Sequence, residues 1–220
     1  MRSRFDCELE LLNNELILMG GLIEKSIQSA VEALVSKDIL EAQNVIKQDK
    51  EVDEKEKTIE QLCLKLLLQQ QPVASDLRFI SSALKMITDM ERIGDQAADI
   101  AELSIYLSQG ANFVEFQHIE KMAKETIDMV TSSIDAFVHR DFTLAKAVIM
   151  KDDIVDSLFI QMKQEVIKLI QKNSEFSEQA TDLLMVAKYF ERIGDHATNI
   201  AEWVIFAITG VHVNHKDIEK

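Results

Sequence analysis

One short motif of this sequence occurs twice. Residues 91–95 and residues 191–195 both read Glu-Arg-Ile-Gly-Asp, and the seven residues that follow each copy also correspond. The duplication reaches beyond this motif, because Asp49 matches Asp152 at an offset of 103. A repeat of this length is typical of a duplicated structural unit. The chain is therefore expected to fold into two similar halves.

Each half is expected to contain three helices. The chain has 220 residues but only one proline and six glycines, and its apolar residues recur every three or four positions. Pro72 ends one helical segment, Gly110 and Gly210 suit left-handed helix ends, and Asp38 suits a helix N-cap. The predicted helices cover about residues 7–35, 38–70, 75–109, 116–138, 141–172 and 177–209.

These segments predict an all-α fold. Short connections favour antiparallel neighbours, so we expect two tandem antiparallel three-helix bundles related by a pseudo-twofold axis. The first repeat spans residues 1–110 and the second spans residues 111–220. Gly20 and Gly21, inside the first helix, predict a kink or a close helix crossing there.

Composition excludes several classes of protein. The formal net charge of −14 disfavours non-specific binding to nucleic acid or to an anionic membrane surface. Cys7 and Cys63 give no disulfide framework. The N-terminus lacks the apolar run of a signal peptide, and no segment reaches the ~20 apolar residues that would span a membrane. We therefore expect a cytoplasmic protein without direct membrane insertion.

The repeated motif carries carboxylates at helical spacing. Glu91 and Asp95 lie four residues apart, on one helical face that continues an apolar stripe. Asp49 and Asp53 have the same spacing on the preceding helix. Carboxylates beside a core must be paired, protonated or bound to a cation. Each half therefore predicts one multi-carboxylate metal site, formed by Asp49, Asp53, Glu91 and Asp95 and by Asp152, Asp156, Glu191 and Asp195.

Hard oxygen ligands suit iron, manganese, magnesium or calcium, and zinc less typically. Arg92 and Arg192 are expected to point away from these carboxylates. The alternative is that each acidic pair is a solvated helix face that the duplication simply copied. Glu56 and Glu60 share the stripe but are set aside, because their repeat partners are Phe159 and Lys163.

The remaining candidate residues are expected to have structural roles rather than to bind a ligand. The Glu-x-x-His at residues 115–118 occurs once and is expected to lie on the surface. His196 is matched by Gln96, which argues against a ligand role. Arg78 is expected to form an ion pair with Asp76. Gly94 and Gly194 lie inside helices and predict a close approach of a neighbouring helix.

The sequence resembles the PhoU family of phosphate-specific transport system accessory proteins over essentially its whole length. The resemblance rests on the doubled Glu-Arg-Ile-Gly-Asp with its continuations, on residues 70–78 and on residues 187–203. It implies two three-helix bundles, a homodimer and a regulator rather than an enzyme. It also implies iron, zinc or another divalent cation on the eight carboxylates named above. Asn199 stands where the first half has Asp99, and the lost charge predicts weaker binding at the second site.

The resemblance further implies a cytoplasmic negative regulator of phosphate uptake and phosphate-starvation signalling. Such a protein acts as an adaptor between the ATPase subunit of the phosphate ABC transporter and a sensor histidine kinase. Three alternatives stay open. They are a redox or storage protein of the di-iron carboxylate type, a helical scaffold whose carboxylates are structural, and a metal store or sensor.

Overall fold

A computed structural model of the chain describes residues 2–69, 73–109 and 117–213. These residues form six α-helices and one short 3₁₀ turn, and they contain no strand. The all-α prediction is therefore confirmed. The helices are α1 (Arg2–Ser36), α2 (Ile39–Gln69), α3 (Ala74–Ser108), α4 (Gln117–His139), α5 (Phe142–Lys172) and α6 (Ser177–Thr209), with η1 (Ser174–Phe176) just before α6.

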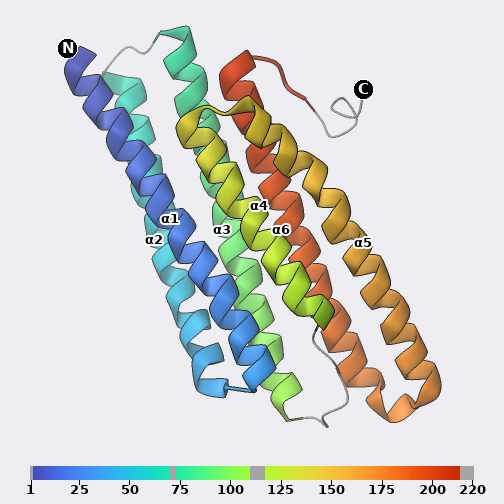
Figure 1. The fold of residues 1–220 in the computed structure, drawn as a ribbon. Coiled ribbons are helices and arrows are strands. Elements are labelled where there is room, and N and C mark those ends of the chain that lie inside the picture. The colour runs from blue at the N-terminus through green and yellow to red at the C-terminus, as the bar shows by residue number, and fades with distance from the viewer. Residues whose placement is uncertain (1, 70–72, 110–116, 214–220) are drawn as a thin grey trace.

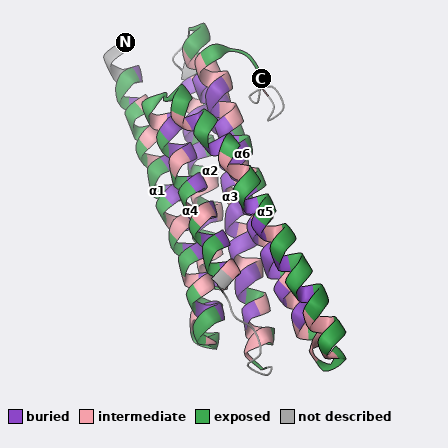
Figure 2. Cartoon of the chain, turned by 45° about the vertical axis from the view of Figure 1, so that its right-hand side comes forward, coloured by how far each residue is buried: buried purple, intermediate pink, exposed green. Residues whose placement is uncertain are grey.

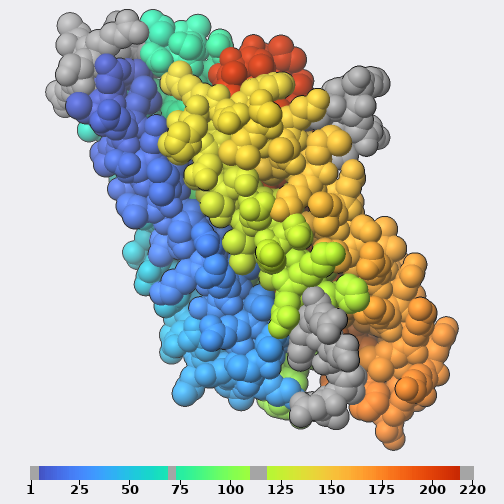
Figure 3. Space-filling model, viewed as in Figure 1, coloured from blue at the N-terminus to red at the C-terminus, as the bar shows by residue number. Residues whose placement is uncertain are grey.

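The helices form two three-helix bundles that lie side by side (Figure 1). Helices α1, α2 and α3 pack together, and so do α4, α5 and α6. The bundles meet where α3 packs on α6 and where α1 packs on α4. The space-filling view shows α4 alongside α1 on one face (Figure 3). Both contacts join repeat-equivalent helices, which is the arrangement that a twofold axis generates. The predicted boundary at residues 110 and 111 lies outside the described residues.

The core follows the apolar stripes of the sequence. Leu12, Leu16, Met19, Ile23 and Ile27 lie on one face of α1 and are fully buried. The other helices likewise turn their buried faces inward (Figure 2). In a folded protein most of the stability of a helix comes from such packing of its apolar face.

A close crossing explains one of the two adjacent glycines in α1. A Cβ atom on Gly20 would lie only 2.6 Å from Cδ1 of Ile134, so Gly20 lets α4 approach α1. A Cβ atom on Gly21 would meet nothing within 4 Å. The close-crossing interpretation is confirmed for Gly20, and Gly21 has no comparable role.

Equivalent turns join the first two helices of each bundle. The Asp38 carboxylate accepts hydrogen bonds from the amides of Leu40 and Glu41, and the Asp141 carboxylate accepts them from Thr143 and Leu144. The preceding residue is left-handed in both turns, with φ of 59° at Lys37 and 53° at Arg140. The predicted N-cap is confirmed at Asp38. Gly210 is left-handed at the end of α6 as predicted, with φ of 77°, whereas Gly110 lies outside the described residues.

Replacing Asp141 by alanine is expected to lower the free energy of unfolding by about 1 kcal/mol, because two amides at the start of α5 lose their acceptor. Urea denaturation followed by circular dichroism measures the change. Asp38→Ala should cost a similar amount, since its turn has the same hydrogen bonds. Asp135→Ala, on an exposed site of α4, is the control that should leave stability nearly unchanged.

The described part of the chain contains no helix that is both long enough and apolar enough to cross a membrane.

Candidate metal centre

Helices α2 and α3 bring the first four predicted carboxylates to one side of the first bundle. We name Asp49, Asp53, Glu91 and Asp95 the first cluster. Gly94 lies at the contact, where a Cβ atom would be 3.2 Å from Oδ1 of Asp49 and 3.1 Å from Cγ1 of Val52. The close approach predicted for this glycine is confirmed. Any larger residue at position 94 would push against the Asp49 carboxylate.

Asp49 has the most perturbed carboxylate of the first cluster. Its pKa is raised from 3.8 to about 6, mainly by burial and then by the negative charges of Asp95, Asp53 and Asp99. Its Oδ1 atom is fully buried and has no hydrogen-bond partner among the residues that the structure describes. A buried carboxylate oxygen without a donor carries the full cost of losing its water. A cation beside Asp49 would remove that cost.

Arg92 supplies part of the missing positive charge. Its Nε atom lies 3.6 Å from Oε2 of Glu91, and its Nη1 atom lies 3.4 Å from Oδ2 of Asp95. The expectation that Arg92 points away from the cluster is therefore wrong. The Arg92 side chain is 57% exposed, and such long contacts in water are weak. The pKa of Glu91 stays raised, first through burial and then through Asp95.

Glu56 also faces the first cluster, although the repeat comparison sets it aside. Its negative charge helps to raise the pKa of Glu91. Its own pKa is raised by burial and by the neighbouring charges of Glu60 and Asp53. The signal for Glu56 was its place on the apolar stripe. Comparing the two repeats led us to set Glu56 aside, because the second half has Phe159 at the matching position.

Helices α5 and α6 build the second cluster in the same way. It consists of Asp152, Asp156, Glu191 and Asp195. A Cβ atom on Gly194 would lie 3.2 Å from Oδ1 of Asp152, the same separation as in the first half. The pKa of Asp195 is raised by burial and by Glu191, and it is lowered in part by Lys188. The duplicated motif therefore produces a duplicated helix contact.

Neither cluster is a closed ligand cage in this conformation. Across residues 2–69, 73–109 and 117–213, no three carboxylate, imidazole or thiol groups converge closely enough to hold one ion. The donor chemistry of the first cluster nevertheless fits a hard cation, because its oxygens are negatively charged and one buried oxygen has no partner. The eight predicted ligands stay a prediction.

A polar contact joins α3 to α6 and explains one difference between the repeats. Oδ1 of Asp89 lies 2.9 Å from Nδ1 of His196 and accepts a hydrogen bond of 3.1 Å from the amide of Asn199. At the equivalent contact, the Tyr189 hydroxyl is hydrogen-bonded to Asp99. Position 199 requires a donor for Asp89, whereas position 99 requires an acceptor for Tyr189. The exchange of Asp for Asn therefore serves the contact between the bundles.

Replacing Asp89 by asparagine is expected to lower the free energy of unfolding by about 1 kcal/mol. The amide oxygen can still accept from His196 and Asn199, but both hydrogen bonds lose the help of the negative charge. Thermal denaturation at pH 7 measures the change. Lys85→Gln, an exposed substitution on the same helix, should have no measurable effect.

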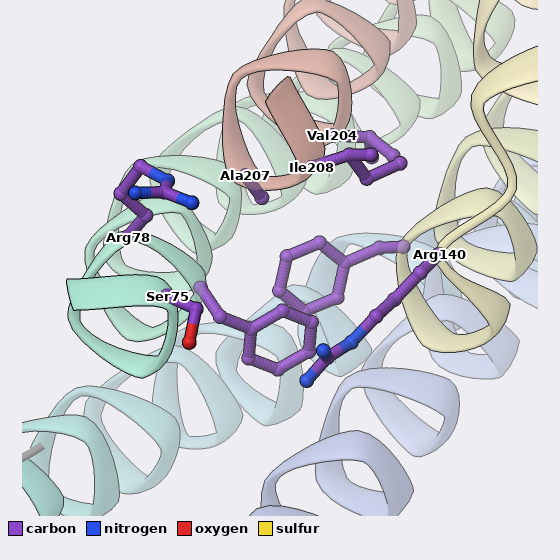
Figure 4. Close-up of a pocket in the computed structure, with 8 residues that line it drawn as sticks. Ser75, Arg78, Arg140, Val204, Ala207 and Ile208 are labelled. Carbon is purple, nitrogen blue, oxygen red and sulfur yellow. The ribbon is translucent and has the colours of Figure 1, made fainter. Parts of the chain in front are cut away.

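A small cavity of about 150 Å³ lies apart from both clusters. It is lined by the stacked rings of Phe79 and Phe137, with Arg78 and Arg140 among the residues around it (Figure 4). Arg140 lies over the Phe79 ring at 4.8 Å. Within the described part of the chain, Nε of Arg78 is buried and has no hydrogen-bond partner, and the predicted ion pair with Asp76 does not form.

These features define a duplicated three-helix bundle protein that carries one acidic helix contact in each half. A family model described as the PhoU domain matches residues 16–104 and again residues 119–204. The chain belongs to the PhoU family, as its motifs indicated. The two matched segments correspond to the two bundles.

Individual relatives match over nearly the whole chain. A protein of Clostridium acetobutylicum named phosphate-specific transport system accessory protein PhoU homolog is 38% identical, over 98% of this chain and 99% of the relative. A protein of the same name from Pseudomonas aeruginosa is 36% identical, over 97% and 88% of the two chains.

Solved structures agree with this assignment. The crystal structure of PhoU from Pseudomonas aeruginosa matches with a TM-score of 0.89 at 35% identity, over 94% of this chain and all of that one. The phosphate transport system regulatory protein PhoU from Streptococcus pneumoniae matches with a TM-score of 0.88 at 29% identity, over 96% and 99% of the two chains.

Proposed function

We propose that this protein is a cytoplasmic regulator of phosphate uptake and of phosphate-starvation signalling. The observation that carries the proposal is the match, over nearly the full length, to relatives that are named accessory proteins of phosphate transport. In this role the protein restrains starvation signalling when phosphate is plentiful. It contacts the ATPase subunit of the phosphate ABC transporter on one side and a sensor histidine kinase on the other.

The proposed mechanism is that of a two-state adaptor. A ligand shifts a protein between states only through different affinities for them, so the adaptor must bind one state of the transporter more tightly than the other. Each bundle is held by a long apolar core and can present a fixed surface to a partner. We also propose that the protein works as a homodimer, which would offer two copies of each surface.

The carboxylate clusters are proposed to hold iron, zinc or another divalent cation. In the first cluster Asp49, Asp53, Glu91 and Asp95 would supply the ligand oxygens. The bound cation would supply positive charge between α2 and α3, where burial and mutual repulsion raise the pKa of Asp49 and Glu91. Metal binding would then stabilise one packing of the bundle.

A complementation experiment tests the regulatory role. The gene would be expressed in a bacterium that lacks its own PhoU protein and derepresses its phosphate-starvation genes. We expect the starvation reporter to fall to its repressed level in high phosphate, and the tagged protein to retain the transporter ATPase subunit and the kinase. An unchanged reporter, with the protein folded and abundant, would contradict the proposal.

The alternative of a di-iron carboxylate enzyme or store has less support. Such sites use histidine ligands on the bundle interior. The described histidines have interactions elsewhere: His118 contacts Glu165, His196 contacts Asp89, His139 contacts the backbone oxygen of Asp135, and His212 stacks on Phe206. Turnover of oxygen or peroxide by the iron-loaded protein would reverse this preference.

A further inference from the structure

The two carboxylate clusters differ at one position that the duplication makes directly comparable. Lys188 on α6 lies three residues before Glu191, and Thr88 on α3 lies three residues before Glu91. Position 188 therefore carries a cation, whereas the matching position 88 carries a neutral hydroxyl. The two clusters therefore differ in charge at a matched position.

The Lys188 ammonium group forms an ion pair with the carboxylate of Glu191; the lysine side chain is 41% exposed and the glutamate side chain 15% exposed. The same ammonium lies 5.4 Å from the centre of the Phe159 ring, a distance at which a cation–π interaction holds it in place. Glu191 belongs to the second cluster, and Phe159 belongs to α5. Lys188 is thus anchored from α5 and from α6.

The first cluster has no equivalent of this lysine. Thr88 is exposed, and Glu56 stands where the second half has Phe159. With Glu56 the first cluster has five carboxylates and the exposed Arg92 guanidinium, a formal charge of −4, whereas the second has four carboxylates and the Lys188 ammonium, a formal charge of −3. Only the first cluster has a buried carboxylate oxygen, on Asp49, that is without a hydrogen-bond partner among the described residues.

We propose that only the first cluster binds divalent cations, and that Lys188 closes the second cluster as its counter-ion. The Lys188 ammonium already neutralises negative charge that a bound metal would otherwise neutralise. A metal must therefore displace Lys188 from Glu191 before it can bind there. The chain then joins a metal-dependent bundle to a metal-independent one. This inference rests on the proposed role of the carboxylates as metal ligands.

A reciprocal exchange of the two residues tests the proposal. Purified protein would be stripped with chelator and titrated with Mn²⁺, and bound metal would be measured by calorimetry and by electron paramagnetic resonance. We expect Lys188→Thr to about double the number of bound ions and Thr88→Lys to reduce wild-type binding at least tenfold. The double variant should bind as many ions as the wild type, but at the second cluster.

Two further variants locate the bound metal. Asp49→Asn should abolish binding in the wild type and leave it intact in the double exchange, whereas Asp195→Asn should do the reverse. Lys85→Thr removes an exposed lysine of α3 and should change nothing. Circular dichroism and gel filtration would confirm that each variant is folded.

Two results would overturn the proposal in distinguishable ways. If the wild type and Lys188→Thr bind equally, and Asp49→Asn and Asp195→Asn each remove half of the metal, both clusters are open and Lys188 is no barrier. If no variant binds Mn²⁺, Zn²⁺ or Fe²⁺, the metal role fails and this inference fails with it. The regulatory role is measured separately, by the starvation reporter, and survives either result.

Discussion

Replacing Gly94 by leucine is expected to lower the free energy of unfolding by about 3 kcal/mol and the melting temperature by about 6–12 °C. A single Cβ at this position already lies 3.1 Å from Val52 and 3.2 Å from the Asp49 carboxylate. Three further carbons would separate α2 from α3. Differential scanning calorimetry of the purified variant measures the loss.

Two controls separate crowding from the effect of glycine itself. Gly21→Leu places the same side chain in a helix at an exposed position with nothing within 4 Å, so it should be neutral or stabilise by up to about 1 kcal/mol. Gly94→Ala should cost less than Gly94→Leu, because the neighbours need to move by only a few tenths of an ångström. A Gly94→Leu variant as stable as wild type would show that the two helices are not packed closely here.

The helices and the glycine contacts could be predicted because they depend on local sequence. Asp38 caps the second helix, and the apolar stripe of α1 gives that helix's buried face directly. Gly94 was informative because glycine inside a helix is unfavourable unless a neighbour requires the space. These inferences need only the spacing of residues along one helix.

Side-chain contacts could not be predicted in the same way. Arg92 was expected to point away from the carboxylates, but its long side chain folds back to Glu91 and Asp95. The change from Asp99 to Asn199 was interpreted as weaker metal binding at the second site, and the structure shows that Asn199 donates a hydrogen bond to Asp89 on the other bundle. Comparing the two repeats treats the halves as independent, so it misses a residue whose partner lies in the other half.

The stability of the metal-free protein is expected to fall as the pH rises through about 6. The folded pKa of Asp49 is about 6, above its ordinary value of 3.8, so the folded protein holds this proton more tightly than the unfolded chain. Stability from this group is therefore fully present below about pH 4 and lost above pH 6. Glu91 and Asp99 act in the same direction, because burial and neighbouring carboxylates raise their pKa values too.

Asp49→Asn removes this titration and should stabilise the metal-free protein at pH 8 by about 2 kcal/mol, a value reduced for partial exposure to solvent. Urea denaturation in chelator at pH 5 and pH 8 would measure the difference. The variant should gain little at pH 5, where the wild-type carboxyl is largely protonated. Glu54→Gln, an exposed change on the same helix, is the control. If Asp49→Asn is destabilising at pH 8, the Asp49 carboxylate has a favourable partner in the folded protein, and repulsion within the cluster is not what a cation would relieve.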